Sequence, residues 1–316
     1  MTLFSWQQKA WEHLPDNRAL AHALLISGPN GIGKRVFAHR LAMRLVCEQG
    51  SACGVCRACR FAAAGNHPDV LLVSPEEGKT EITVDNARSI NQFLALTPHM
   101  APRRVALIDA ADRLNRSAAN AILKTLEEPP AESFLLLVSD APHRLLPTIR
   151  SRCQQMPLTK PEPAIALEYL RKRHVVEPTA ALAIAHGAPL AAEALPKDAL
   201  DTALRLLQTL ENLACGVEDA PTASEAWHAV DLSYGLSLLT DILADIVQLA
   251  LAGDLSAPLH PDWRSRLRIF LTRLDLQKVF RVWDEVLELR AVVDAPLDRR
   301  LIWDTLFLSF ERLRVQ

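Results

Sequence analysis

A glycine-rich segment near the start of the chain constrains the fold more than any other feature. The segment Gly28-Pro-Asn-Gly-Ile-Gly-Lys34 follows an apolar run and precedes a stretch with helical periodicity. In a P-loop of the form G-x-x-x-x-G-K, backbone N–H groups and the helix N-terminus hold phosphates, and the lysine meets the β- and γ-oxygens. The spacing predicts a P-loop with Gly28, Gly31, Gly33 and Lys34 as nucleotide-binding residues. A glycine turn without a ligand is the alternative.

The residues that would complete a hydrolytic site are altered. Where a P-loop has Ser or Thr to bind magnesium, this chain has Arg35, and a guanidinium cannot ligate a cation. An apolar run ends in Asp109, which suits the second half of the site, but Ala110 stands where a catalytic glutamate would polarise water. We therefore expect a vestigial site with little or no ATPase activity of its own. Whether it binds ATP stays open.

Short apolar runs alternate with helical patterns in the first half of the chain. Five runs are predicted as strands, and four of them have the near-continuous apolar character of parallel strands that are covered on both faces. Their residues are 22–27, 70–73, 105–109, 134–138 and 154–158. The alternation predicts a doubly wound α/β domain with a parallel five-stranded sheet.

The pattern changes after residue 158. Pro161 and Pro163 mark a boundary, and no convincing strand follows them. Short helices are expected up to about residue 200 and longer ones beyond it, with Gly253 ending the helix predicted over residues 232–252. We predict three domains, and the two that follow the α/β domain are all-α. Their ranges are 1–158 (P-loop domain), 159–203 (small helical lid) and 204–316 (helical oligomerisation domain, or collar).

Four of the six cysteines lie close together in the sequence. Cys47, Cys53, Cys56 and Cys59 form the pattern C-x5-C-x2-C-x2-C. Four thiolates with two-residue gaps suit tetrahedral zinc, and a site with no open position is structural. We predict an inserted zinc module over residues 47–59. A redox pair or incidental thiols are the alternatives.

Charge and hydropathy limit the classes of protein. The 316 residues carry a net charge of −2, with 18 Lys and Arg against 14 Asp and Glu in residues 1–158. This small excess is far below that of a protein that grips many phosphates alone. No signal segment opens the chain, so we expect a cytoplasmic protein. The apolar stretch 232–252 contains Asp241 and Asp245, which argues against a membrane span.

An arginine follows the fourth predicted strand in Ser151-Arg152-Cys153. At this place in a P-loop fold, Arg152 can project into the nucleotide site of a neighbouring subunit, where it would stabilise charge on the γ-phosphate as an arginine finger. On the residues alone, a surface salt bridge is the more frequent explanation.

Together these features resemble the delta-prime family of bacterial DNA polymerase III subunits, which are AAA+ clamp-loader proteins. The resemblance covers nearly the whole chain but is specific only within residues 22–158. Its marks, besides the P-loop and the cysteines, are the segments Gly65-Asn-His-Pro-Asp69, Asn120-Ala-Ile-Leu-Lys-Thr-Leu-Glu-Glu-Pro-Pro130 and Ser151-Arg-Cys153. The resemblance implies a hetero-pentamer with tau/gamma ATPase subunits and a delta subunit, which loads a sliding clamp onto primed DNA.

Within such a complex, the resemblance implies a stator that supplies Arg152 in trans to the ATP of an adjacent subunit. Leu190 stands where a sensor arginine would lie in cis, which adds to the defects of the chain's own site. An active motor of the tau/gamma type is the first alternative. A stand-alone P-loop kinase with a zinc knuckle is the second, and it leaves the helical second half unexplained.

Overall fold

Five parallel strands form one sheet, and the spatial order of the strands is β2-β3-β4-β1-β5. The computed structural model describes all residues except 1, 77, 254–262, 273, 294–297 and 314–316. The strands are β1 (Ala23–Ser27), β2 (Val70–Val73), β3 (Arg104–Ile108), β4 (Ser133–Ser139) and β5 (Gln154–Pro157). All five predicted strands are confirmed within one residue at each end. In the described residues after 157 there is no further strand.

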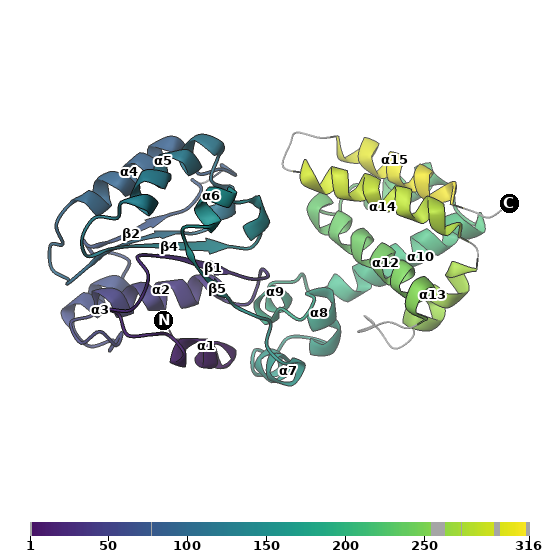
Figure 1. Ribbon diagram of the computed structural model, residues 1–316. Helices are drawn as coiled ribbons and strands as arrows, with labels where there is room; N and C mark the ends of the chain where they lie inside the picture. Colours follow the sequence, from purple (N-terminus) through teal and green to yellow (C-terminus); the bar gives the residue numbers. More distant parts are fainter. Residues whose placement is uncertain (1, 77, 254–262, 273, 294–297, 314–316) are drawn as a thin grey trace. The chain divides into compact units, whose positions relative to one another are not determined.

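Helices cover both faces of this sheet (Figure 1). Alternate residues of a strand point to opposite faces, so Leu24 and Ile26 of β1 pack with α2 while Leu25 packs on the side of α4 and α5. The central strands β1, β3 and β4 are buried along their whole length, which explains their apolar sequences. The helices of this part are α1 (Gln8–Glu12), α2 (Lys34–Val46), α3 (Arg57–Ala63), α4 (Val84–Ala95), α5 (Arg116–Glu127), α6 (Pro147–Arg150), α7 (Pro163–Lys172) and α9 (Pro189–Glu193).

The chain divides into two compact units. The first comprises residues 1–172 and 187–192, and the second comprises residues 173–186 and 193–316. The segment 159–203 thus contributes to both units. The division into three domains, with boundaries at 158 and 203, stays a prediction.

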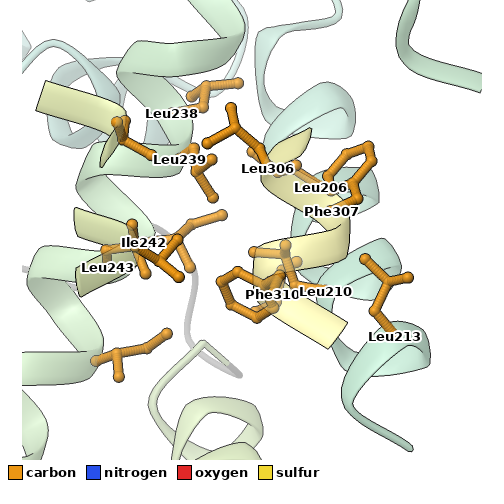
Figure 2. Packing of buried hydrophobic residues seen from close by; sticks show 14 of the residues in the cluster. Leu206, Leu210, Leu213, Leu238, Leu239, Ile242, Leu243, Leu306, Phe307 and Phe310 are labelled. Carbon is orange, nitrogen blue, oxygen red and sulfur yellow. The ribbon is translucent and has the colours of Figure 1, made fainter. Parts of the chain in front are cut away.

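The second unit is entirely helical in its described residues and has one apolar core. Figure 2 shows how Leu206 and Leu210, Leu239 and Leu243, and Phe307 converge from three different helices. The helices of this unit are α8 (Pro178–Ile184), α10 (Ala199–Cys215), α11 (Ala220–Trp227), α12 (Leu232–Ala252), α13 (Trp263–Leu271), α14 (Leu276–Ala291) and α15 (Arg299–Glu311). The helix predicted over 232–252 is confirmed, and Gly253 ends it in the left-handed conformation.

Within the described residues, α12 alone is long and apolar enough to cross a membrane, and half of its apolar window is buried in the structure. Its buried residues belong to the core of the second unit. The helix also carries Asp245, which accepts a hydrogen bond of 2.9 Å from Trp263 Nε1. These are the contacts of a core helix.

The Asp245 carboxyl makes the stability of the second unit depend on pH. Burial raises its pKa to about 6, and although the Trp263 N–H bond opposes this, the nearby Asp241 carboxylate adds to the rise. A group whose pKa is raised on folding stabilises the fold at low pH. That contribution is lost as the pH rises from the unfolded pKa of about 4 through the folded pKa.

We therefore predict that Asp245→Asn stabilises the protein at pH 8 and has little effect at pH 4.5, because asparagine keeps an oxygen for Trp263 without a charge. Thermal denaturation should show a rise in Tm of roughly 5 °C at pH 8. Asp284→Asn, on the exposed face of α14, is the control and should change Tm little at either pH. An equal effect of Asp245→Asn at both pH values would contradict the assignment.

Candidate nucleotide and metal sites

The P-loop lies between β1 and α2, and its glycines are required by the backbone. Gly31 and Gly33 have φ of 77° and 85°, in the left-handed region that favours glycine. A Cβ at Gly31 would lie 2.5 Å from the Cβ of Ala191. The N–H of Leu190 donates to the Gly31 carbonyl at 2.9 Å, so α9 packs directly on the loop. The loop thus has the left-handed glycines and close packing that require glycine here, and its nucleotide-binding role stays a prediction.

Lys34 is already neutralised by the chain itself. Its side chain is only 4% exposed, and Nζ lies 2.5 Å from Asp140 Oδ1 and donates to the Pro29 carbonyl at 2.5 Å. Asp140 follows β4, and parallel strands bring their carboxyl ends to one edge of the sheet. The charge that would meet a phosphate therefore has an intramolecular partner.

Arg35 is paired in the same way. Its Nε forms an ion pair with Oδ2 of Asp109, the residue that directly follows β3. Asp109 is 8% exposed, and the arginine is 67% exposed. Asp109 and Lys34 thus lie at the same edge of the sheet, but the guanidinium of Arg35 is paired with the carboxylate that would help to hold magnesium.

The end of β3 carries no glutamate to activate water, because Ala110 stands at that position. Ala110 has φ of 65°, an unusual conformation for a residue with a Cβ. The next acidic residue, Asp112, accepts from Ser139 Oγ at 2.7 Å and from the Asp140 N–H at 3.0 Å. Its carboxylate therefore orders the end of β4.

The four predicted metal ligands come together. Their sulfur atoms all lie within 4.8 Å of one another, with Cys47 Sγ 3.7 Å from Cys53 Sγ and 3.9 Å from Cys56 Sγ. Cys53 and Cys59 are 4.0 Å apart at Sγ. A tetrahedral ion with metal–sulfur bonds of about 2.3 Å needs sulfur–sulfur distances of about 3.8 Å. The set fits one tetrahedral metal ion.

Backbone N–H groups favour the thiolate form of Cys47 and Cys53 in this cluster, whereas burial raises the pKa of Cys59 to about 12. The N–H of Cys56 donates to Cys53 Sγ, and the N–H of Cys59, in the first turn of α3, donates to Cys56 Sγ, each at 3.4 Å. Burial raises the pKa of Cys47, but backbone N–H groups, led by that of Cys53, outweigh it and lower the pKa to about 6. Gly54, with φ of 77°, provides the turn between two ligands.

Arg152 lies apart from the P-loop contacts. It follows α6, and its Nη2 lies 2.6 Å from Glu127 Oε1 at the end of α5. Its Nη1 donates to the Thr148 carbonyl at 3.1 Å. Among the described residues, none of its polar contacts is with the P-loop.

Comparisons with known proteins identify the family. A family model described as "DNA polymerase III, delta subunit" matches residues 6–162. DNA polymerase III subunit delta' of Pseudomonas aeruginosa is 34% identical over 321 aligned residues, covering 98% of each chain. The chain belongs to the delta-prime family of DNA polymerase III subunits.

Further relatives agree with this assignment. The Escherichia coli delta' subunit is 38% identical over 180 residues, which cover 55% of this chain and 54% of that protein. A solved gamma subunit-related protein from Thermotoga maritima has a TM-score of 0.50 at 20% identity, covering 98% of this chain and 99% of that one. This likeness supports the AAA+ fold of this delta-prime family member.

Sequence reasoning missed the part that the N-terminal segment plays at the P-loop. Trp6 Nε1 donates to the Ile32 carbonyl at 3.0 Å, and Gln7 Nε2 donates to the Gly33 carbonyl at 2.8 Å. A cavity of about 360 Å³ opens beside them, with Leu158 also in its wall. Gln7 is 1% exposed, but an isolated polar residue in a sequence gives no sign of such burial.

The cysteine cluster predicts that metal is part of the folded first unit. We expect one metal ion per chain by elemental analysis, and a lower Tm after chelation or in Cys56→Ser, because metal–thiolate binding energy is folding energy. Cys215→Ser, an exposed cysteine outside the cluster, is the control. A metal-free chain with an unchanged melting curve would contradict the site.

The ion pair between Arg35 and Asp109 predicts a way to restore a magnesium site. Arg35→Thr should release Asp109 and supply a hydroxyl, so that magnesium tightens ATP binding by about tenfold, as measured by calorimetry. Arg35→Ala releases Asp109 without the hydroxyl and should gain less. If Arg35→Thr bound ATP with the same affinity as the wild type, both with and without magnesium, the Arg35–Asp109 ion pair would not be what blocks the magnesium site.

Proposed function

We propose that this chain is the stator subunit of the DNA polymerase III clamp loader. In this role it joins tau/gamma ATPase subunits and a delta subunit in a hetero-pentamer that loads the ring-shaped sliding clamp onto primed DNA. It supplies Arg152 in trans to the ATP of a neighbouring subunit and does not turn over nucleotide itself. Membership of the delta-prime family supports this proposal, and a replication subunit would act in the cytoplasm.

One observation carries the proposal. The two cations of the P-loop, Lys34 and Arg35, are paired with Asp140 and Asp109 of the same chain. By contrast, Arg152 is 36% exposed and is held at the surface. In such a subunit the cations of its own nucleotide site are already paired, while Arg152 is accessible to another subunit. It can therefore assist ATP hydrolysis by a neighbour without hydrolysing ATP itself.

The cysteine cluster supports a structural zinc ion in this subunit. Cys47 and Cys59 are buried, and four thiolates complete a tetrahedron with no position for substrate. Bound there, zinc would supply folding energy. The ligands hold residues 47–59 against α2, whose Met43 packs on the cluster.

The second unit supports a role in assembly. Phe280 and Leu287 lie seven residues apart on α14, and Leu301 and Leu308 have the same spacing on α15. All four are exposed, and a seven-residue spacing places each pair on one face of its helix. We propose that residues 204–316 form the collar that joins the pentamer.

An active motor of the tau/gamma type is less well supported. It would need a hydroxyl at position 35 and a glutamate at position 110, and the chain has Arg35 and Ala110 there. A stand-alone kinase would need a P-loop lysine that is free for phosphate. Appreciable ATP turnover by the purified chain alone would contradict the stator proposal and favour one of these enzymes.

The trans finger is tested in the assembled complex. Arg152→Ala should leave the pentamer intact and lower ATP turnover at the adjacent site by at least about 100-fold, because an arginine finger stabilises charge in the transition state. The DNA-stimulated ATPase rate of the reconstituted complex is the measurement. Arg150→Ala, an exposed arginine two residues away, is the control. Unchanged turnover in Arg152→Ala would reject the role.

A further inference from the structure

Arg152 is held in place by contacts from two helices. Glu127, the last residue of α5, lies 2.6 Å from Nη2, and the Thr148 carbonyl of α6 accepts from Nη1 at 3.1 Å. Ser151 Oγ is a third, longer contact at 3.5 Å from Nη1. Each terminal nitrogen of the guanidinium is thereby held by a residue of a different helix.

The element that presents Glu127 is itself well anchored. Asn115 caps the N-terminus of α5 by accepting from the Ala118 N–H at 2.9 Å. Ile122 and Leu126 of the same helix are buried in the core beneath it. The following Pro129 and Pro130 cannot continue the helix, so the carboxylate is presented from a fixed end.

This ion pair contributes little to the stability of the fold. The Glu127 side chain is 50% exposed, and ion pairs between exposed side chains add little to the free energy of unfolding. A free arginine side chain, however, has many rotamers, and this conformational entropy is lost when the side chain is ordered. Binding to a phosphate in another subunit costs less conformational entropy when folding has already ordered the arginine side chain.

We propose that Glu127 is a positioning residue for Arg152, and this rests on the proposed function of Arg152 as a trans finger. Glu127 and Thr148 hold the terminal nitrogens from the side of their own subunit. A guanidinium has five N–H donors, so it keeps others for a phosphate. No hydrogen-bond partner of Arg152 Nε occurs among the described residues. Glu127 thus acts through the orientation of Arg152 and does not touch the nucleotide.

The test uses the reconstituted complex and compares Glu127→Ala, Glu127→Gln and Glu128→Ala. Glu127→Ala should lower kcat of the DNA-stimulated ATPase at the adjacent site about tenfold with little change in KM for ATP. Glu127→Gln keeps an acceptor oxygen for Nη2 and should stay within about threefold of wild type. Glu128, exposed at the end of the same helix and without a contact to Arg152, is the matched control.

A double variant separates this role from a general effect on structure. In the Arg152→Ala background, Glu127→Ala should cause no further loss, because it acts only through the arginine. Subunit stoichiometry and Tm should equal those of the wild type. If a complex with Glu127→Ala failed to assemble, Glu127→Lys would serve as the second variant. In an assembled complex, the positive charge of the lysine beside Arg152 should lower kcat. In the Arg152→Ala background, Glu127→Lys should have no effect on kcat.

Three results would overturn the inference. They are a kcat of Glu127→Ala equal to wild type, a kcat above wild type (which would make the ion pair a restraint on the finger), and a further loss in the Arg152→Ala background. A full-rate Arg152→Ala complex would instead reject the trans finger itself. The two failures are therefore distinguishable.

Discussion

The arrangement of the nucleotide site depends on two intramolecular ion pairs at the carboxyl edge of the sheet. Asp109 and Asp140 follow the adjacent parallel strands β3 and β4. Asp140 pairs with Lys34, and Asp109 pairs with Arg35, the first two residues of α2. In a working P-loop ATPase, the lysine would face the phosphates and the acidic group would face the metal. Here each charge has a partner within the fold. Neither Lys34 nor Asp109 therefore depends on a nucleotide or a metal ion for a charged partner.

This pairing is consistent with how closely the chain packs around the P-loop. Ala191 of α9 leaves no room for a side chain at Gly31, and the ring of Phe4 does the same at Gly33. Gln7, buried beside the loop, donates to the carbonyl of Gly33. A loop that must open and close around a ligand needs few such restraints. These contacts suit a subunit that keeps a single conformation.

Much of this could be predicted because the strongest patterns are local. Continuous apolar strands, a glycine-rich turn and closely spaced cysteines each fix their own geometry, and the five strands and the sulfur cluster were found in this way. The partners of Lys34 and Arg152 could not be predicted. Asp140 and Glu127 are distant in sequence, and only the register of the sheet and the ends of α5 bring them close. The helix Val84–Ala95 was also missed at the sequence level.

Helix α5 lies in the sequence between Asp112 and Arg152, the residues that belong to these two regions. Before its N-terminus, Asp112 orders the end of β4, from which Asp140 reaches Lys34. At its C-terminus, Glu127 holds Arg152. Twelve residues at 1.5 Å each give the helix a length of about 18 Å. Both ion pairs join elements of the first unit that pack on the sheet, so the fold of this unit alone places Lys34 and Arg152. For the proposed trans finger, this means that contacts within its own subunit already order the guanidinium of Arg152.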